Sequence, residues 1–274
     1  AVREEVAQRL AARGALRAGA PATELIPSGQ TSVNVRELVR DNAALEQAVF
    51  APRLIGFYEG LLGGPVRHYD HIWLRLISPG LGTAPHCDLV YMGRGTPQVM
   101  TAWIPYRDVD LMLGGLMILE HSHRQAERLR PYLRSDADTY CTNRNAYLHK
   151  SGYLSTNPVT LREKLGGRWL TAAFQAGDLL TFGMTTVHAS LDNQAQAYRL
   201  SSDTRYQLAA EPIDPRWVGP EYDPAARDWS ISVVAPFFRD GVWAGSVGHD
   251  MRVSRLLGKL IRASDAGQES FSRP

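Results

Sequence analysis

The stretch QVMTAWIPYRDVDLMLGGLMILE, residues 98–120, decides the fold class. Its first part, residues 98–109, is rich in β-branched and aromatic side chains, and its last part, residues 115–120, is an apolar run. Asp110 and Gly114 lie in the segment between them. Short runs of this kind, separated by Gly and Asp, are typical of β-strands joined by turns. The stretch therefore predicts two strands of a β structure.

The same pattern continues on both sides of this stretch. Residues 66–78 are rich in aromatic and β-branched side chains and end at Pro79 and Gly80. Further candidate strands are residues 88–92, 169–174, 178–182, 186–191 and 200–209. Many short strands with turn residues between them favour an antiparallel barrel or jelly roll. We therefore expect a mainly β fold.

Helical patterns flank the predicted strands. Apolar residues near helical spacing predict helices over 2–18, 35–50 and 52–62, with Gly63 ending the last, and a surface helix over 251–263. We expect a single domain over 1–274, with a helical flank at 1–64, a jelly-roll core at 66–210 and a C-terminal extension at 211–274. The polar insert at 124–167 interrupts the core, and such a long loop is usually functional, often as a lid.

The composition is that of a globular protein. Of the 274 residues, 44% are hydrophobic and 21% charged, and the net charge of +2 gives no field that would favour nucleic acid or a membrane surface. Two cysteines, Cys87 and Cys141, are too few for a disulfide framework, and residues 1–8 contain no apolar signal segment. These features favour a reduced, cytoplasmic setting. The chain starts on Ala1 rather than Met, so a removed leader stays open, as does the oligomeric state.

A histidine and a carboxylate in the segment His86-Cys87-Asp88 are candidate metal ligands. On a strand, residues i and i+2 share one face, so His86 and Asp88 point the same way while Cys87 points away. His188 would complete two histidines and one carboxylate, the facial set that leaves open positions on non-haem Fe(II). The tripeptide alone is a weak signal, because a His beside an Asp is more often a hydrogen-bonded surface pair.

The surroundings of His188 strengthen this interpretation. Gly177 and Asp178 predict a turn before the apolar run 179–182, and Arg199 lies eleven residues beyond His188. An arginine on the following strand can present its rigid guanidinium fork to a carboxylate of a bound ligand.

Two segments together carry a family resemblance. The run HCDLVYMGRGTPQVMTAWIPYRDVDLMLGGLMILEHSHR, residues 86–124, and the run GDLLTFGMTTVHASLDNQAQAYRLSSDTRYQ, residues 177–207, resemble the phytanoyl-CoA dioxygenase family of Fe(II)/2-oxoglutarate oxygenases. The resemblance covers roughly residues 66–210 and implies a double-stranded β-helix, a form of jelly roll, here with N- and C-terminal flanking helices. It departs from the family at 120–123, where Glu-His-Ser-His replaces the usual Pro-Gly-Ser-His.

The resemblance also implies roles for individual residues. The iron ligands would be His86, Asp88 and His188. The cosubstrate 2-oxoglutarate would meet Arg199 and Ser190, and then Trp103, Thr101 and Arg75. The expected reaction uses O₂ and 2-oxoglutarate to hydroxylate or otherwise oxidise a small organic molecule, releasing succinate and CO₂. Because Asp88 is present, a halogenase, in which chloride takes the place of this ligand, is disfavoured. Within the insert, Tyr140, Asn143, Arg144 and Tyr153 are candidate substrate or lid residues.

A cupin is the main alternative. Gly115, His121, His123 and Glu127 match the start of the cupin metal motif, and His188 would be the fourth ligand. Such a protein would be a metal-dependent isomerase, a dioxygenase without 2-oxoglutarate, or a small-molecule-binding jelly roll. The glycine expected after Glu127 is Arg134, however, and a cupin gives Arg199 no role. A non-catalytic jelly roll is a further alternative, against which the complete ligand set argues.

Overall fold

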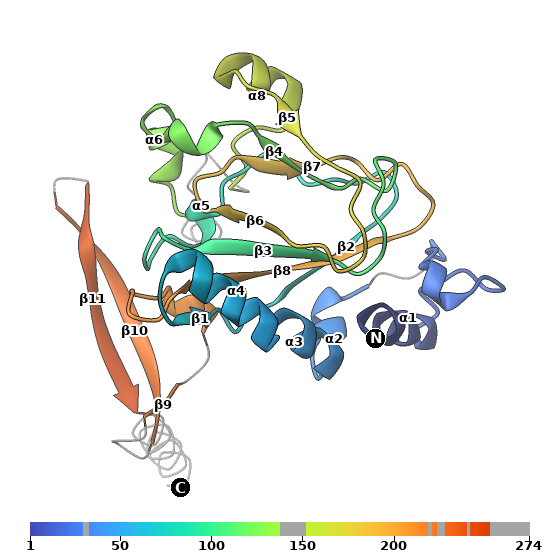
Figure 1. Cartoon of the computed structure of the whole chain (residues 1–274), viewed down its shortest axis with the longest axis horizontal. Coiled ribbons are helices and arrows are strands. Elements are labelled where there is room, and N and C mark those ends of the chain that lie inside the picture. Colours follow the sequence, from blue (N-terminus) through green and yellow to red (C-terminus); the bar gives the residue numbers. More distant parts are fainter. Residues whose placement is uncertain (30–32, 138–151, 219–220, 224–227, 240–241, 253–274) are drawn as a thin grey trace, which may run out of the picture. The chain divides into compact units, whose positions relative to one another are not determined.

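The computed structural model describes residues 1–29, 33–137, 152–218, 221–223, 228–239 and 242–252 (Figure 1). Contacts divide the chain into two compact units, residues 1–212 and 213–274. The expectation of one domain over the whole chain stays a prediction. Among the described residues, no helix has both the length and the apolar character needed to cross a membrane.

The first unit is built on two antiparallel sheets. The larger has the order β1-β8-β3-β6, and β2 pairs with β8 beyond the end of β1. Its strands are β1 (Val66–His68), β2 (Trp73–Ile77), β3 (Met100–Pro105), β6 (Leu180–Gly183) and β8 (Arg199–Leu208). The smaller sheet, in the order β5-β4-β7, consists of β4 (Leu116–Leu119), β5 (Trp169–Leu170) and β7 (His188–Ser190). In Figure 1, β4 and β7 lie above β6, β3 and β8. This architecture confirms the predicted mainly β jelly-roll fold.

The central strand β8 separates two environments. Side chains alternate across a strand, so residues of one parity face one side of the sheet. Leu200 and Tyr206 pack in apolar clusters with residues of the N-terminal helices. Arg199 and Asp203, of the opposite parity, line a cavity between the two sheets. One face of β8 thus holds the helices in place, while the other supplies polar groups to the interior.

Four helices cover the outer face of the larger sheet, and they lie below it in Figure 1. They are α1 (Val2–Ala12), α2 (Val35–Val39), α3 (Ala43–Val49) and α4 (Pro52–Leu62), and a short 3₁₀ turn, η1 (Ala22–Glu24), follows α1. The single helix expected over 35–50 is broken at Asp41, whose φ is 52°. Asn42 then caps α3 by accepting a hydrogen bond from the Leu45 N–H at 3.0 Å. Gly63, with φ 77°, ends α4 as predicted.

The described residues of the insert include two helices of the first unit. These are α6 (Ala126–Leu133) and α8 (Pro158–Leu165), with the 3₁₀ turn η2 (Ser122–Arg124) before them. Leu129 and Leu161 from these helices pack in one buried cluster with Cys87, Val90 and Val187. The described part of the insert is therefore attached to the core by apolar contacts next to residue 87.

The second unit corrects the expected C-terminal helix. After the turn η3 (Pro215–Trp217), an antiparallel sheet is formed by β9 (Glu221–Asp223), β10 (Asp228–Arg239) and β11 (Val242–Arg252). Met251 and Arg252, expected to start a helix, pair with Ile231 and Ser230. Helical spacing within 251–263 does not reveal that a preceding hairpin strand offers hydrogen bonds to its first residues. Residues 253–263 lie outside the described residues.

Candidate metal centre

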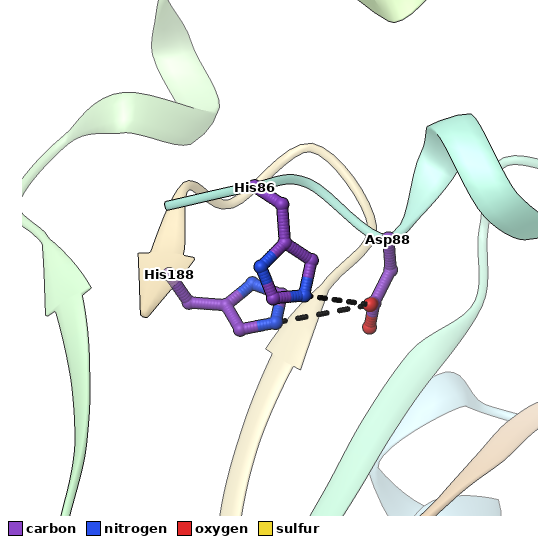
Figure 2. A group of neighbouring side chains, drawn as sticks. All are labelled: His86, Asp88 and His188. Atoms are coloured by element: carbon purple, nitrogen blue, oxygen red, sulfur yellow. Dashed lines mark ion pairs between the residues drawn. The ribbon is translucent and has the colours of Figure 1, made fainter. Parts of the chain in front are cut away.

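Two imidazoles and one carboxylate meet in the first unit. His86, Asp88 and His188 are buried, and their ligand atoms all lie within 4.8 Å of one another. Asp88 Oδ1 is 3.9 Å from His86 Nε2 and 3.7 Å from His188 Nε2 (Figure 2). No other group of three His, Cys, Asp or Glu residues in the described part of the chain converges in this way. The three candidate iron ligands are thus brought together.

The backbone brings them together in a way that corrects the strand argument. His86 and His188 form an isolated antiparallel bridge, with N–H to carbonyl distances of 3.0 and 2.9 Å. Asp88 is not extended: its φ and ψ are −65° and −27°, and it precedes the single-turn helix α5 (Leu89–Met92). The expected strand over 88–92 is therefore wrong. The chain turns after Cys87, and that turn, rather than strand alternation, carries the carboxylate toward the imidazoles.

The two imidazoles are held in one tautomer. Nδ1 of His86 donates to the Ala84 carbonyl at 2.8 Å, and Nδ1 of His188 donates to the Thr186 carbonyl at 3.1 Å, because a carbonyl oxygen only accepts. Burial, and then His188, lower the pKa of His86 to about 3, and burial likewise lowers the pKa of His188. Both rings are therefore neutral, and each Nε2 presents a lone pair to the space beside Asp88 (Figure 2).

The carboxylate of Asp88 is held from its other side. Its Oδ2 accepts a hydrogen bond from the Thr101 hydroxyl at 2.5 Å and from an Arg205 guanidinium nitrogen at 2.9 Å. Burial alone would raise the pKa of Asp88, but Arg205, the two histidines and the Thr101 hydrogen bond hold it below its usual range. The carboxylate is therefore ionised, with Oδ1 turned toward the imidazoles. Sequence reasoning missed Arg205, and it expected Thr101 at the cosubstrate rather than at Asp88.

A cavity between the two sheets adjoins this cluster. Its lining includes Arg75, Thr101, Trp103, His188, Ser190 and Arg199. The Arg199 side chain is 2% exposed, donates from one terminal nitrogen to the Gly114 carbonyl, and has no hydrogen-bond partner at Nε. Burial, and then Arg75, lower its pKa to about 10, so it is still a cation at neutral pH. A buried cation with an unsatisfied donor is suited to a carboxylate ligand.

The other predicted cosubstrate residues that line this cavity differ in their hydrogen-bond partners. Ser190 Oγ accepts from the Thr83 N–H at 2.8 Å, which leaves its hydroxyl proton available to a ligand. The Arg75 guanidinium already binds Asp203, at 2.7 and 3.2 Å. Trp103 donates from Nε1 to Ser201 Oγ at 3.1 Å, so it offers the cavity a ring face or edge rather than a free donor.

The second described part of the insert, which starts at residue 152, reaches the metal cluster. The Tyr153 ring centroid lies 6.0 Å from that of His86, and the Tyr91 ring lies 5.7 Å from it on another segment. The Leu154 N–H donates to the Pro85 carbonyl at 2.8 Å, immediately before His86. Of the predicted lid residues only Tyr153 can be placed; Tyr140, Asn143 and Arg144 lie outside the described residues.

The cupin ligand set does not assemble. His121, His123 and Glu127 are all exposed, whereas His188 is buried. His121 has a left-handed backbone, with φ 58°, before the turn η2. These side chains and His188 do not form a group of converging ligands among the described residues. The structure therefore contradicts the cupin assignment of metal ligands.

A jelly roll with two histidines and one carboxylate beside an internal cavity defines a class, the facial-triad metalloproteins. The family model described as phytanoyl-CoA dioxygenase (PhyH) matches residues 2–201. The chain therefore belongs to the phytanoyl-CoA dioxygenase family, as the sequence motifs predicted. No curated protein matches the chain at a significant level.

The chain is similar to several solved structures at low identity. EctD from S. alaskensis, solved with 2-oxoglutarate and 5-hydroxyectoine, is 15% identical, with a TM-score of 0.51 over 80% of this chain and 70% of that one. The alpha-ketoglutarate-dependent epimerase SnoN from nogalamycin biosynthesis is 21% identical, with a TM-score of 0.47 over 88% of this chain and 85% of that one. AviO1 from Streptomyces viridochromogenes is 17% identical, with a TM-score of 0.47 over 78% of this chain and 86% of that one.

Proposed function

We propose that the protein is a non-haem Fe(II)- and 2-oxoglutarate-dependent dioxygenase that oxidises a small organic molecule. The observation that carries this proposal is the pairing of two features in one cavity. One is the cluster of His86, Asp88 and His188, and the other is the buried, incompletely satisfied cation of Arg199. A site that bound only a metal would not require a buried cation with an unsatisfied hydrogen-bond donor.

The donor set fits ferrous iron. Iron would be held by Nε2 of His86, Oδ1 of Asp88 and Nε2 of His188, two neutral imidazoles and one carboxylate oxygen. This set leaves coordination positions open and is typical of non-haem Fe(II) oxygenases. When bound, iron supplies the activation of O₂, coupled to conversion of 2-oxoglutarate to succinate and CO₂ and to oxidation of the substrate.

The protein's own part is to bind and orient 2-oxoglutarate. Arg199 would bind the carboxylate remote from the metal, and the free hydroxyl proton of Ser190 would add a hydrogen bond to it. Trp103 and Arg75 would complete the contact surface, whereas the hydroxyl of Thr101 is already bonded to Asp88 Oδ2 at 2.5 Å. Because the cavity lies between the two sheets and is lined mostly by buried side chains, it would also restrict the access of water to the reacting groups.

The substrate would enter beside the insert. Tyr153, whose ring lies near that of His86, would contact it, and Tyr140, Asn143 and Arg144 are proposed as further contacts of the same insert. Other proteins of this fold bind quite different small molecules, such as nogalamycin RO in SnoN and 5-hydroxyectoine in EctD. The substrate class is therefore proposed only as a small organic molecule, oxidised by hydroxylation or a related reaction.

The proposal is tested by succinate formation. The purified protein, screened with candidate small molecules, should form succinate only when Fe(II), 2-oxoglutarate and O₂ are all present. Asp88→Ala should abolish this activity, whereas His121→Ala, which alters an exposed histidine outside the cluster, should not. If His121→Ala abolished metal binding while Asp88→Ala preserved it, the proposal would be wrong and the cupin set would hold the metal.

A further inference from the structure

We infer that Arg205 is a positioning residue that, together with Thr101, restricts Asp88 to a single metal-binding oxygen. The inference rests on the proposed function, because it concerns the same metal cluster. It goes beyond it by assigning a role to a buried arginine that touches neither the metal ligands' imidazoles nor the proposed cosubstrate.

The carboxylate of Asp88 is divided between two tasks. Oδ2 accepts hydrogen bonds from the Thr101 hydroxyl at 2.5 Å and from Arg205 at 2.9 Å, which uses both of its lone pairs. Oδ1 faces Nε2 of His86 and of His188 at 3.9 and 3.7 Å. For Asp88 to chelate a metal with both oxygens, Oδ2 would have to give up at least one of these charge-assisted or short hydrogen bonds.

Arg205 is itself fixed and cannot follow a moving carboxylate. Arg205 is 1% exposed. Its other terminal nitrogen donates to Asp203 Oδ2 at 2.6 Å, and its guanidinium lies 4.5 Å from the ring centroid of Trp73. Asp203 is in turn bound by Arg75 at 2.7 and 3.2 Å. The fork of Arg205 thus bridges two carboxylates, a geometry that a planar guanidinium provides and an ammonium does not.

The restriction matters for the proposed cosubstrate. A chelating 2-oxo acid needs two metal positions and O₂ a third, so three protein donors leave none to spare in six-fold coordination. If Asp88 bound through both oxygens, it would compete with 2-oxoglutarate for one of those positions. Arg205 and Thr101 therefore keep a coordination position free for 2-oxoglutarate.

A role limited to neutralising buried charge makes a different prediction. Arg205→Lys keeps the positive charge but loses the fork, and Thr101→Val removes only the hydroxyl donor from Oδ2. Under the inference, both variants should weaken 2-oxoglutarate binding at saturating Mn(II), by about 10-fold, the lower end of the effect of groups that orient a metal ligand. Under simple charge neutralisation, Arg205→Lys should leave that affinity unchanged.

The test uses the full chain loaded with Mn(II), which avoids oxidation of iron. Mn(II) affinity is measured by titration followed by electron paramagnetic resonance, and 2-oxoglutarate affinity by calorimetry without O₂. Arg168→Lys is the matched control, because Arg168 makes a two-pronged contact with Glu120, at 3.0 and 2.9 Å, on the exposed surface. It should leave both affinities at the wild-type value. Chemical unfolding of each variant shows whether the fold survives, and Thr101→Val carries the test if Arg205→Lys does not fold.

The outcomes separate this inference from the proposed function. Weaker 2-oxoglutarate binding in the folded variants at saturating Mn(II) supports the inference. Unchanged 2-oxoglutarate affinity overturns it, whether or not Mn(II) affinity falls. If the wild-type protein fails to bind Mn(II), or if Asp88→Ala binds it equally well, the proposed function itself fails and the inference falls with it.

Discussion

The phenolic oxygen of Tyr132 accepts a hydrogen bond from the backbone N–H of Cys87 at 3.0 Å. The same oxygen donates to the Gly152 carbonyl at 2.7 Å. One side chain of the insert is therefore bonded both to Cys87, between two proposed metal ligands, and to Gly152, twenty residues further along the insert. All of these groups are buried, so water cannot replace either bond.

Removing the Tyr132 hydroxyl should destabilise the segment between His86 and Asp88. Tyr132→Phe leaves a buried N–H and a buried carbonyl without a partner, which costs about 1–3 kcal/mol for each unsatisfied group. We expect a lower free energy of unfolding in urea and weaker Mn(II) binding. Tyr106→Phe is the control. It removes a hydroxyl that is bonded to Ser202 at 2.6 Å and does not contact the segment His86–Asp88. Equal Mn(II) affinity in Tyr132→Phe and the wild type would contradict this expectation.

A methyl group at Gly152 should separate the insert from α5. The added Cβ would lie 2.4 Å from the Tyr91 ring, and the φ of +71° is itself unfavourable for alanine. Gly63→Ala has a similar φ of +77° with nothing within 4 Å, so it measures the backbone cost alone, about 1–2 kcal/mol. Gly152→Ala should therefore be clearly the more destabilising variant in thermal unfolding. Similar melting temperatures for the two variants would show that Tyr91 moves aside freely.

Replacing Arg199 should affect 2-oxoglutarate far more than the fold. Arg199→Met removes a buried cation whose Nε has no partner, so the ligand-free protein should lose little stability. A charge-assisted hydrogen bond contributes about 1.5–3 kcal/mol, so 2-oxoglutarate should bind about 10- to 100-fold more weakly. Calorimetry at saturating Mn(II) measures this change, and Arg168→Met serves as an exposed control. Unchanged 2-oxoglutarate affinity would remove Arg199 from the cosubstrate site.

Tyr58 should make the protein sensitive to alkaline pH. Burial raises its pKa from 10.0 to about 12, against the smaller effects of Thr181 and Arg205. The unfolded chain then releases this proton from pH 10 upward while the folded chain keeps it until about pH 12. The stabilisation is complete below pH 10 and is lost between pH 10 and 12, by about 2–3 kcal/mol at 1.36 kcal/mol per pKa unit.

Urea unfolding at pH 8 to 11 checks this expectation. Tyr58→Phe should show a shallower decline of the unfolding free energy with pH than the wild type. Thr181→Val is the matched control, because it removes the partner hydroxyl, 2.9 Å away, and keeps the phenol. Parallel pH profiles for the wild type and Tyr58→Phe would assign the alkaline sensitivity to other groups.

The sequence predicted much of this architecture and the main features of the site. The order of short apolar runs predicted the jelly roll, and the motif around His86 with the distant His188 predicted the cluster that the structure assembles. The reason given for the convergence of His86 and Asp88 was wrong, because Asp88 has a helical backbone. The turn after Cys87 carries the carboxylate toward the imidazoles, and two backbone hydrogen bonds between His86 and His188, about 100 residues apart, bring the two imidazoles together.

Other features depended on contacts that spacing along the chain does not reveal. Arg205 has the same parity as Arg199 on β8, so alternation could have placed it in the interior, but its bond to Asp88 depends on how β3 and β8 pair. The break at Asp41 and the strand ending at Arg252 likewise reflect a capping side chain and a hairpin partner. Both outweigh the helical spacing of nearby apolar residues.

His86 and His188 are paired through their backbones in an antiparallel bridge. The geometry of the metal cluster therefore depends on how these two segments of the chain are aligned. β7 is aligned on its other side by Ile118 opposite His188 in β4. Inserting or deleting one residue in β7 would put Val187 or Ala189 opposite residue 86 and turn the imidazole to the other side of the sheet. In related chains, side chains around the cluster should therefore vary more freely than the number of residues in these segments.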